Sequence, residues 1–458
     1  MTLRKRIITA SAWTLGSSVV EFGIRLVSNL IMTRLLFPEA FGLIAASTSI
    51  MIALNLVSDL GIRAVVIQSV HGDDDSFLRS AWAFQLVRGI VLFLVLLAVC
   101  ALISLPLVRS VLSPGSVFAN PIFPWLTLFL GISLVFHGLE STAVALNVRR
   151  LNYRPLVLLD LTGKLTSVPV MIAFAIVSPS VWALAIGALA GSLVRTVLSH
   201  LMVPGPKMAF VWDKAYIREM THFGKWITVS STASFVVSQS DVILFGLLLP
   251  SSFLGIYFLA KTLIGTVEGL LERLNGALTL PVLGEVIRTN PANLRDRYYR
   301  FRLPIDLAAA ACGGFVFMTG SQIISILYDA RYAEAGPMLR LFALGLAIYP
   351  FQIIRSAFMA VGNTRTIAAV TVIQAGSLVV LLLIGFFTAG PLGAVAGVAL
   401  SRLVPSAAIL LAANGRRWMS VWHELRVVLL FVAGLLLGEM TLMMGRSLAP
   451  VALRHFFG

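Results

Sequence analysis

Residues 81–105 read AWAFQLVRGIVLFLVLLAVCALISL, and the one charged side chain in this stretch is Arg88. A helix of about 20 mainly apolar residues crosses a bilayer, so the stretch predicts a membrane-spanning helix. A basic side chain in hydrocarbon costs about 2.5 to 3.5 kcal/mol on insertion scales, so it usually faces a protein interior or a water-filled cavity. The stretch therefore predicts a membrane protein with positive charge in its interior.

Comparable apolar stretches follow one another along the whole chain. The composition agrees, because 58% of the residues are hydrophobic and 12% are charged, against about 25% charged in a typical soluble domain. Thirteen spans are expected, at residues 11–35, 40–66, 81–105, 121–146, 155–178, 180–203, 223–249, 252–284, 303–327, 337–360, 366–389, 391–413 and 424–445. We therefore predict an all-α integral membrane protein with about 13 transmembrane helices.

Eleven basic residues lie inside these predicted spans. They are Arg25, Arg34, Arg63, Arg88, Lys164, Arg195, Lys261, Arg273, Arg340, Arg355 and Arg402. Together they predict a cationic chamber in the membrane that suits a large anionic solute. Five of them can instead extend their side chains to the water interface, namely Arg34, Arg88, Arg195, Arg340 and Arg402.

Basic residues outside the spans concentrate in alternate connections. With the N-terminus in the cytoplasm, twenty lie in inside segments or helix ends, and four lie outside: Arg109, Arg331, Arg446 and Arg454. Cytoplasmic loops of membrane proteins carry the excess of Lys and Arg, so we expect a cytoplasmic N-terminus. The same pattern accounts for most of the net charge of +15, and no nucleic-acid partner is expected.

The sequence also repeats itself at an offset of 213 residues. PWLTLF at 124–129 returns as PMLRLF at 337–342, and Trp13, Ser17, Ser18 and Gly42 match Trp226, Ser230, Ser231 and Gly255. The offset covers six spans, an even number, so the two halves have the same orientation and are parallel repeats.

The repeat predicts the domain organisation. We expect an N-terminal six-helix lobe at 1–203, a cytoplasmic linker at 204–222, a second six-helix lobe at 223–416, and an additional helix with a tail at 417–458. In transporters built from repeats the solute binds at the repeat interface, so the site is expected there.

Two pairs of opposite charges are spaced four residues apart in the first two spans. Glu21 with Arg25, and Asp59 with Arg63, should each share one helix face within pairing distance. Each pair can line the chamber, or it can neutralise itself and hold helices together. If the pairs line the chamber, Asp59 and Glu21 are candidate ion-coupling groups.

The spans that correspond to these by the repeat are also polar. The span 252–284 carries Lys261, Glu268, Glu272 and Arg273, and the span before it carries Gln239 and Asp241. Lys261 has no acidic neighbour four residues away, so it needs a carboxylate of another helix or an anionic solute. Asp241 and Glu268 join the candidate ion-coupling groups.

Smaller polar groups admit structural explanations. His137 and Glu140 are a candidate for proton linkage, with a satisfied structural histidine as the alternative. Asp160 with Lys164 is expected to be an internal pair, and the acidic run 73–75 is expected to be a solvated loop.

Motifs for nucleotide or metal chemistry are absent from the sequence. It contains no G-x-x-x-x-G-K-[ST], H-E-x-x-H or G-x-S-x-G. Cys100 and Cys312 lie in apolar segments without metal-ligand spacing. We therefore expect no cofactor, no metal and no ATP hydrolysis by this chain.

Several motifs, in order along residues 10–417, resemble a known family. They are LFPEAFG at 36–42, SDLG at 58–61, RRLNYRPL at 149–156, DVILFG at 241–246, GIY at 255–257 and RSAFMAVG at 355–362. The chain resembles the bacterial polysaccharide transporters, the Wzx-type oligosaccharide flippases, within the multidrug/oligosaccharidyl-lipid/polysaccharide exporter superfamily. The resemblance implies the fold of that superfamily.

The resemblance also implies a function. It is transfer of undecaprenyl-pyrophosphate-linked oligosaccharide repeat units across the bacterial inner membrane for exopolysaccharide, capsule or O-antigen assembly, by alternating access driven by an ion gradient. Expected partners are that lipid-linked oligosaccharide, membrane lipids, and the polysaccharide polymerase and export machinery.

The resemblance points to particular binding residues as well. Lys261 in Tyr257-Phe258-Leu259-Ala260-Lys261 is similar to the basic residue that follows Tyr-x-x-Ala in peptidoglycan lipid flippases. This implies a pyrophosphate contact for Lys261, and less directly for Arg25. The expected substrate-binding set is Arg25, Arg63, Lys261, Arg273 and Arg355, with Glu21, Asp59, Asp241 and Glu268 as ion-coupling carboxylates.

Two other functions remain open. One is a multidrug or other lipid exporter of the same fold, and an exporter of drugs or organic cations would favour an acidic, aromatic-lined chamber. A polysaccharide polymerase or ligase would require large external loops with candidate catalytic residues, whereas the outside loops here are short. The sequence therefore favours a transporter over an enzyme.

Overall fold

The computed structural model describes residues 3–289, 294–415, 418 and 420–456. In these residues the regular secondary structure is helical, with one isolated bridge between Ser116 and Pro250. The chain separates into two compact units, Met1–Gly255 and Ile256–Gly458. The predicted all-α class is confirmed, while the predicted lobe boundary at 204–222 stays a prediction.

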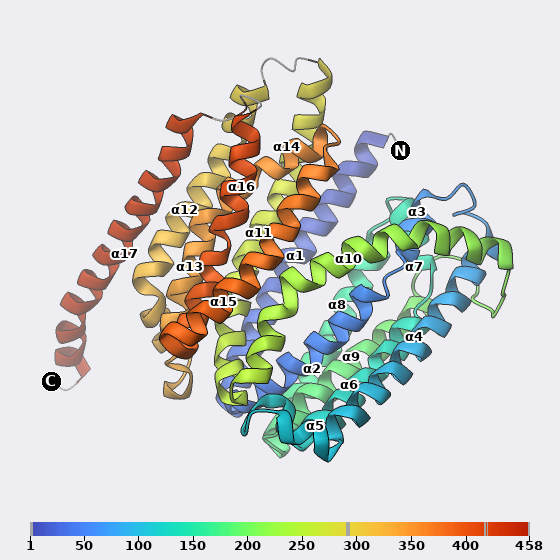
Figure 1. The fold of residues 1–458 in the computed structure, drawn as a ribbon, viewed down its shortest axis with the longest axis horizontal. Coiled ribbons are helices and arrows are strands. Elements are labelled where there is room, and N and C mark those ends of the chain that lie inside the picture. The colour runs from blue at the N-terminus through green and yellow to red at the C-terminus, as the bar shows by residue number, and fades with distance from the viewer. Residues whose placement is uncertain (1–2, 290–293, 416–417, 419, 457–458) are drawn as a thin grey trace. The chain divides into compact units, whose positions relative to one another are not determined.

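The first unit contains the helices up to the start of α11 (Figure 1). They are α1 (Leu3–Leu35), α2 (Pro38–Val57), α3 (Ile62–Gln68), α4 (Asp75–Ser104), α5 (Pro106–Val111), η1 (Val117–Ala119), α6 (Ile122–Leu139), α7 (Ala143–Arg149), α8 (Arg154–Val177), α9 (Val181–Leu201) and α10 (Lys214–Leu248).

The second unit contains most of α11 and everything after it. Its helices are α11 (Ser251–Thr289), α12 (Leu294–Leu327), η3 (Ala330–Tyr332), α13 (Ala335–Gln352), α14 (Ile354–Ala360), α15 (Thr364–Ser401), α16 (Leu403–Asn414) and α17 (Val421–Phe456).

Eleven stretches of the described residues are helical, long and apolar enough to cross a membrane. One of them, Thr364–Asn414, covers the two predicted spans 366–389 and 391–413. The backbone leaves helical geometry between these spans, at Ala389 and at Gly390, which has φ +67°. The predicted first span lies in α1, which is not among the eleven. Each predicted span therefore coincides with a helix over most of its length, although 40–66, 121–146 and 337–360 each run on into a second, short helix.

The helix bounds follow the sequence repeat. The helices α6 and α13 both have 18 residues, and Ile122 and Ala335 at their starts are 213 residues apart, as are Leu139 and Gln352 at their ends. A seven-residue helix follows each of them, α7 in the first case and α14 in the second. The two halves of the chain therefore share helix lengths at these positions as well as sequence motifs.

Three connections that we expect on one side of the membrane meet at one end of the first unit. The Arg149 guanidinium donates to the Ser69 carbonyl oxygen at 2.7 Å, and the Asn147 amide donates to the Pro204 carbonyl oxygen at 2.7 Å. Figure 1 shows α3 and α7 at this end and α5 at the other. The isolated bridge joins two connections expected on the opposite side. Successive helices of this unit therefore alternate in direction as predicted.

The acidic run 73–75 is tied to the same polar end. The half-exposed Asp73 carboxylate accepts hydrogen bonds from Arg149 Nε and Arg150 Nη2, both at 2.9 Å. The hydrogen bond from Arg150, together with the charge of Arg149, holds the pKa of Asp73 below its ordinary value despite partial desolvation. The loop is solvated, as predicted, but it also joins α7.

Two glycines related by the repeat allow a close crossing between the starts of α2 and α11. A Cβ added at Gly42 would overlap the Ser251 carbonyl oxygen, and one added at Gly255 would overlap the Pro38 carbonyl oxygen. Glycine is required here because two backbones approach each other directly.

The additional C-terminal helix packs along α12 (Figure 1). The Arg302 side chain, which is fully buried in α12, contacts Glu424 of α17 at 2.6 Å and Asp306 of its own helix at 2.6 Å. Arg426 of α17 contacts Asp306 at 2.8 Å. A buried charge requires such partners, so α17 is joined to α12 by a specific polar network.

Candidate functional site

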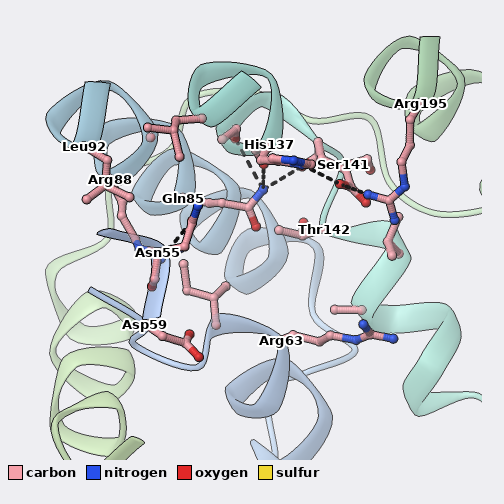
Figure 2. A pocket seen from close by; sticks show the side chains of 17 residues that line it. Asn55, Asp59, Arg63, Gln85, Arg88, Leu92, His137, Ser141, Thr142 and Arg195 are labelled. Carbon is pink, nitrogen blue, oxygen red and sulfur yellow. Dashed lines mark hydrogen bonds and ion pairs between the residues drawn. The ribbon is translucent and has the colours of Figure 1, made fainter. Parts of the chain in front are cut away.

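The first unit contains a polar cavity of about 270 Å³ (Figure 2). It lies among the end of α2, the start of α3, α4, the end of α6 with the turn into α7, and α9. Its polar lining consists of Asn55, Asp59, Arg63, Gln85, Arg88, His137, Glu140, Ser141, Thr142 and Arg195. Leu92 and Leu134 supply an apolar part of the wall. Such a lining suits a hydrated solute that bears negative charge.

A break between α2 and α3 positions two of the predicted residues. Gly61 has φ +60°, and its N–H donates to the Asp59 carboxylate at 2.8 Å. A left-handed residue interrupts a helix, so the predicted continuous span 40–66 is wrong. Asp59 and Arg63 therefore do not share a helix face, and Figure 2 shows the Arg63 guanidinium directed away from Asp59.

Asp59 is fixed by α10 instead. Its carboxylate accepts a hydrogen bond from the Ser231 hydroxyl at 3.2 Å, and its backbone oxygen accepts one from the Thr228 hydroxyl at 2.9 Å. Arg63 is exposed at the start of α3, and the contacts of the described residues include no ion pair for it. Its charge is therefore available to the cavity.

Arg88 closes the end of α2. Its guanidinium donates to the backbone oxygens of Ser58 and Asn55 at 2.9 and 2.8 Å, and to the Ser58 hydroxyl at 3.0 Å. The last carbonyl groups of a helix lack partners within it and carry partial negative charge, so a cation stabilises them. The Arg88 side chain is therefore fixed in the cavity wall by α2, while its depth relative to the water interface stays a prediction.

Arg195 of α9 joins two carboxylates. Its Nη1 contacts Glu140 at 2.6 Å and its Nε contacts Asp160 at 3.0 Å. The Nδ1 atom of His137 lies 3.8 Å from the same Glu140 carboxylate. Arg195 is therefore fixed between α6 and α8, and His137 is the second potential cation beside Glu140.

Gln85 of α4 shapes the end of α6. Its amide donates to the backbone oxygens of His137 at 2.7 Å and Glu140 at 3.0 Å (Figure 2). The chain leaves helical geometry at Glu140, so the last carbonyl groups of α6 lose regular helical partners, and the His137 oxygen accepts only a long hydrogen bond from the Glu140 N–H at 3.4 Å. Gln85 thereby fixes the turn that presents the Glu140 carboxylate.

A second cavity, of about 380 Å³, shares Arg195 with the first. In it the Lys164 ammonium contacts the Glu21 carboxylate at 2.6 Å, while Asp160 pairs with Arg195. The predicted pairs Glu21–Arg25 and Asp160–Lys164 are therefore wrong, because partners on other helices lie closer than partners one turn away. Arg25 is exposed on α1.

The second unit contains four of the predicted residues. On α11, the Lys261 ammonium lies 6.0 Å from the Tyr257 ring centroid, within cation–π range, and Arg273 is exposed. Glu268 forms an ion pair with Arg402, with Oε2 and Nη2 3.2 Å apart. Arg402 is therefore paired inside the protein as well.

Arg355 of α14 is half-buried and held by α15. Its guanidinium donates to Gln374 Oε1 at 3.1 Å and to Thr371 Oγ1 at 3.0 Å. Both partners are neutral, so the contacts described for Arg355 leave its charge uncompensated. Asp241 of α10 is buried and lines neither of the two cavities.

The structure brings together only some of the predicted residues. Asp59 and Arg63 line the first cavity, Glu21 lines the second, and the other six predicted site residues lie elsewhere. Asn55, Gln85, Arg88, Glu140 and Arg195 line the first cavity but were absent from the predicted site. The available signal was that three of these five, Arg88, Glu140 and Arg195, are charged side chains inside predicted spans with no oppositely charged residue four positions away on the helix.

Comparison with solved structures identifies the class. A lipid II flippase MurJ in an inward closed conformation matches with a TM-score of 0.70 at 14% identity, over 97% of this chain and 99% of that one. An inward-facing multidrug resistance MATE family transporter of the MOP superfamily matches with a TM-score of 0.62 at 14% identity, over 89% and 94%. The chain is a multi-pass membrane protein with the fold of these transporters.

Sequence comparison narrows the class to a family. Residues 31–337 match the family described as polysaccharide biosynthesis protein, and the chain belongs to that family. The lipopolysaccharide biosynthesis protein WzxC of Escherichia coli (strain K12) is 21% identical over 414 residues, 88% of this chain and 80% of the relative. The succinoglycan biosynthesis transport protein ExoT of Rhizobium meliloti (strain 1021) is 21% identical over 349 residues, 76% and 68%. The family predicted from the motifs is confirmed.

Proposed function

We propose that this protein is a flippase that moves undecaprenyl-pyrophosphate-linked oligosaccharide repeat units across the bacterial inner membrane. The substrate would feed exopolysaccharide, capsule or O-antigen assembly. The N-terminus would lie in the cytoplasm, and transport would follow alternating access driven by an ion gradient. The chain would act as a transporter and not as an enzyme, delivering its cargo to a polymerase and export machinery.

The observation that carries the proposal is the lining of the first cavity. A lipid-linked oligosaccharide leaves its tail in the bilayer while a pyrophosphate and sugars cross, so the path must offer cations and hydrogen-bonding groups. Arginine side chains make two-pronged contacts with phosphate, and amides and hydroxyls serve sugar hydroxyl groups. Arg63, Arg88 and Arg195 supply the cations, and Asn55, Gln85 and Thr142 are among the neutral groups.

The same lining disfavours an exporter of organic cations. Three arginines face two carboxylates, Asp59 and Glu140, in the first cavity, and its polar groups carry no aromatic ring apart from the imidazole of His137. An organic cation would find neither an excess of carboxylates nor aromatic rings, the two features that favour its binding. A lipid exporter with a different anionic headgroup is the alternative that the lining leaves open.

Arg63 offers the sharpest test, because the described ion pairs do not include it. In reconstituted vesicles with a fluorescent lipid-linked oligosaccharide, Arg63→Gln should slow flipping by about 10-fold or more, since a hydrogen bond to a charged group is worth about 1.5–3 kcal/mol. Arg109→Gln, which removes an exposed arginine outside the cavity, is the matched control and should flip at the wild-type rate.

Equal rates for Arg63→Gln and wild type would remove Arg63 from the substrate path. A wild-type protein that moves no lipid-linked oligosaccharide, while an unrelated flippase does so in the same vesicles, would contradict the function itself.

A further inference from the structure

The cluster around Arg195 contains one more carboxylate than base. Glu140 and Asp160 both contact the one guanidinium, at 2.6 and 3.0 Å. Glu140 is mostly buried, with 13% of its side chain exposed. Asp160 is 41% exposed and can be solvated by water, so Glu140 is the buried member of the cluster, and the excess of negative charge favours one additional positive charge beside it.

His137 is the group that can supply this charge. Its Nδ1 atom lies 3.8 Å from the Glu140 carboxylate, and half of its side chain is exposed, at the cavity wall. Imidazole is the side chain that takes up a proton near neutral pH. A protonated His137 would attract Glu140 by the same Coulomb force that now attracts Arg195.

Most of the other charged groups near Glu140 already have partners. Arg88 is bound to the end of α2, and Lys164 of α8 is paired with Glu21 of α1. The His200 ring of α9 contacts the Leu139 carbonyl oxygen at 2.8 Å. Asp59 and Arg63 face the cavity from the other wall, and Asp59 is held by α10. Among the described groups, His137 is therefore the one placed to compete with Arg195 for Glu140.

We propose that His137 and Glu140 form a proton-binding site that controls the anion affinity of Arg195. Without the proton, Glu140 holds Arg195 and masks its charge from the cavity. With the proton on His137, Glu140 pairs with the imidazolium, and Arg195, still oriented by Asp160, presents its Nη1 edge to a phosphate. The proton goes from water in the cavity to the imidazole ring and returns by the same route.

This proposal rests on the proposed function for the identity of the anion, and its test measures binding rather than transport. The probe is a short-chain isoprenyl-pyrophosphate-linked sugar, a pyrophosphate diester whose own charge does not change between pH 5.5 and pH 8. Binding to the detergent-solubilised full chain is measured by calorimetry at both pH values.

The wild-type protein should bind the probe about fivefold or more tightly at pH 5.5 than at pH 8, in the usual range of coupling between sites. Glu140→Gln should bind equally well at both pH values, because neutral glutamine no longer holds Arg195. His137→Gln should bind weakly at both. His222→Gln, which removes an exposed histidine of α10, should keep the wild-type pH dependence.

Binding by the wild type that does not change with pH would overturn the His137 site and leave the flippase proposal intact. An unchanged pH dependence in His137→Gln would overturn it as well. If none of the variants alters binding while the protein still flips the lipid in vesicles, the anion site lies elsewhere and the flippase function stands. Loss of flipping by the wild-type protein would instead contradict the function.

Discussion

Arg88 and Arg195 illustrate how a basic residue is kept inside a membrane protein. Each has several fixed partners: helix-end carbonyl groups for Arg88 and two carboxylates for Arg195. The spacing of residues along one helix identifies neither arrangement, because every partner lies on a different helix from the arginine that it contacts. The sequence therefore predicted that these charges lie inside the protein, but it assigned Glu21 and Asp160 to bases of their own helices instead of Lys164 and Arg195.

Asp73 provides a test at the level of one residue, outside the membrane spans. Its folded pKa is lowered, so its contribution to stability is present above its unfolded pKa of about 3.9 and is lost as the pH falls through the folded value. Asp73→Asn should reduce stability at pH 7 by about 0.2–1 kcal/mol, because the pair is half exposed.

The measurement is thermal unfolding in detergent from pH 7 down to pH 3, over which the difference between Asp73→Asn and wild type should become smaller. Asp74→Asn is the control, since Asp74 is exposed and the described ion pairs do not include it. A deficit of Asp73→Asn that persists undiminished at pH 3 would show that charge is not its cause.

At the scale of helices, hydropathy and the 213-residue repeat were sufficient to predict the spans, because long apolar runs have few alternatives in a bilayer. The equal lengths of α6 and α13 are the clearest result of this kind. The break before α3 was missed, although Ser58-Asp59-Leu60-Gly61 contains the Asp and Gly that favour a turn. The i, i+4 charge spacing was given more weight than this turn signal, and the cavity wall was misplaced as a result.

Gly61→Ala tests the importance of that break. Gly61 has φ +60°, and a Cβ there would overlap the Ile227 side chain, so the substitution should destabilise the protein by about 1–3 kcal/mol. Gly376→Ala is the control, because no atom lies within 4 Å of its Cβ position and its helix tolerates alanine.

Thermal unfolding monitored by tryptophan fluorescence compares the two variants. A melting temperature of Gly61→Ala at or above that of Gly376→Ala would mean that the α2–α3 connection adapts without strain.

At the scale of the whole molecule, the alternating direction of the helices predicts which connections reach each side of the membrane. In a background with Cys100 and Cys312 replaced by alanine, Ser113→Cys should react in intact cells with a thiol reagent that cannot cross the inner membrane. Lys207→Cys should react only after the membrane is permeabilised. Both positions are exposed, so accessibility within the protein does not separate them.

The opposite labelling pattern would reverse the proposed orientation, and labelling at both positions in intact cells would contradict the expectation that they lie on opposite sides. Residues 290–293, in a connection expected on the cytoplasmic side, lie outside the described residues, as do Arg416 and Arg417, two of the twenty basic residues expected on that side.

The crossing at Gly42 and Gly255 has a consequence for the origin of the molecule. Pro38 and Gly42 meet Ser251 and Gly255 through contacts that are interchanged by the repeat, which is how identical subunits meet across a two-fold axis. In an ancestor with a single repeat, this crossing would have been a homodimer interface in which one glycine faced its own copy. In one chain the two positions can vary independently, yet neither backbone leaves room for a side chain.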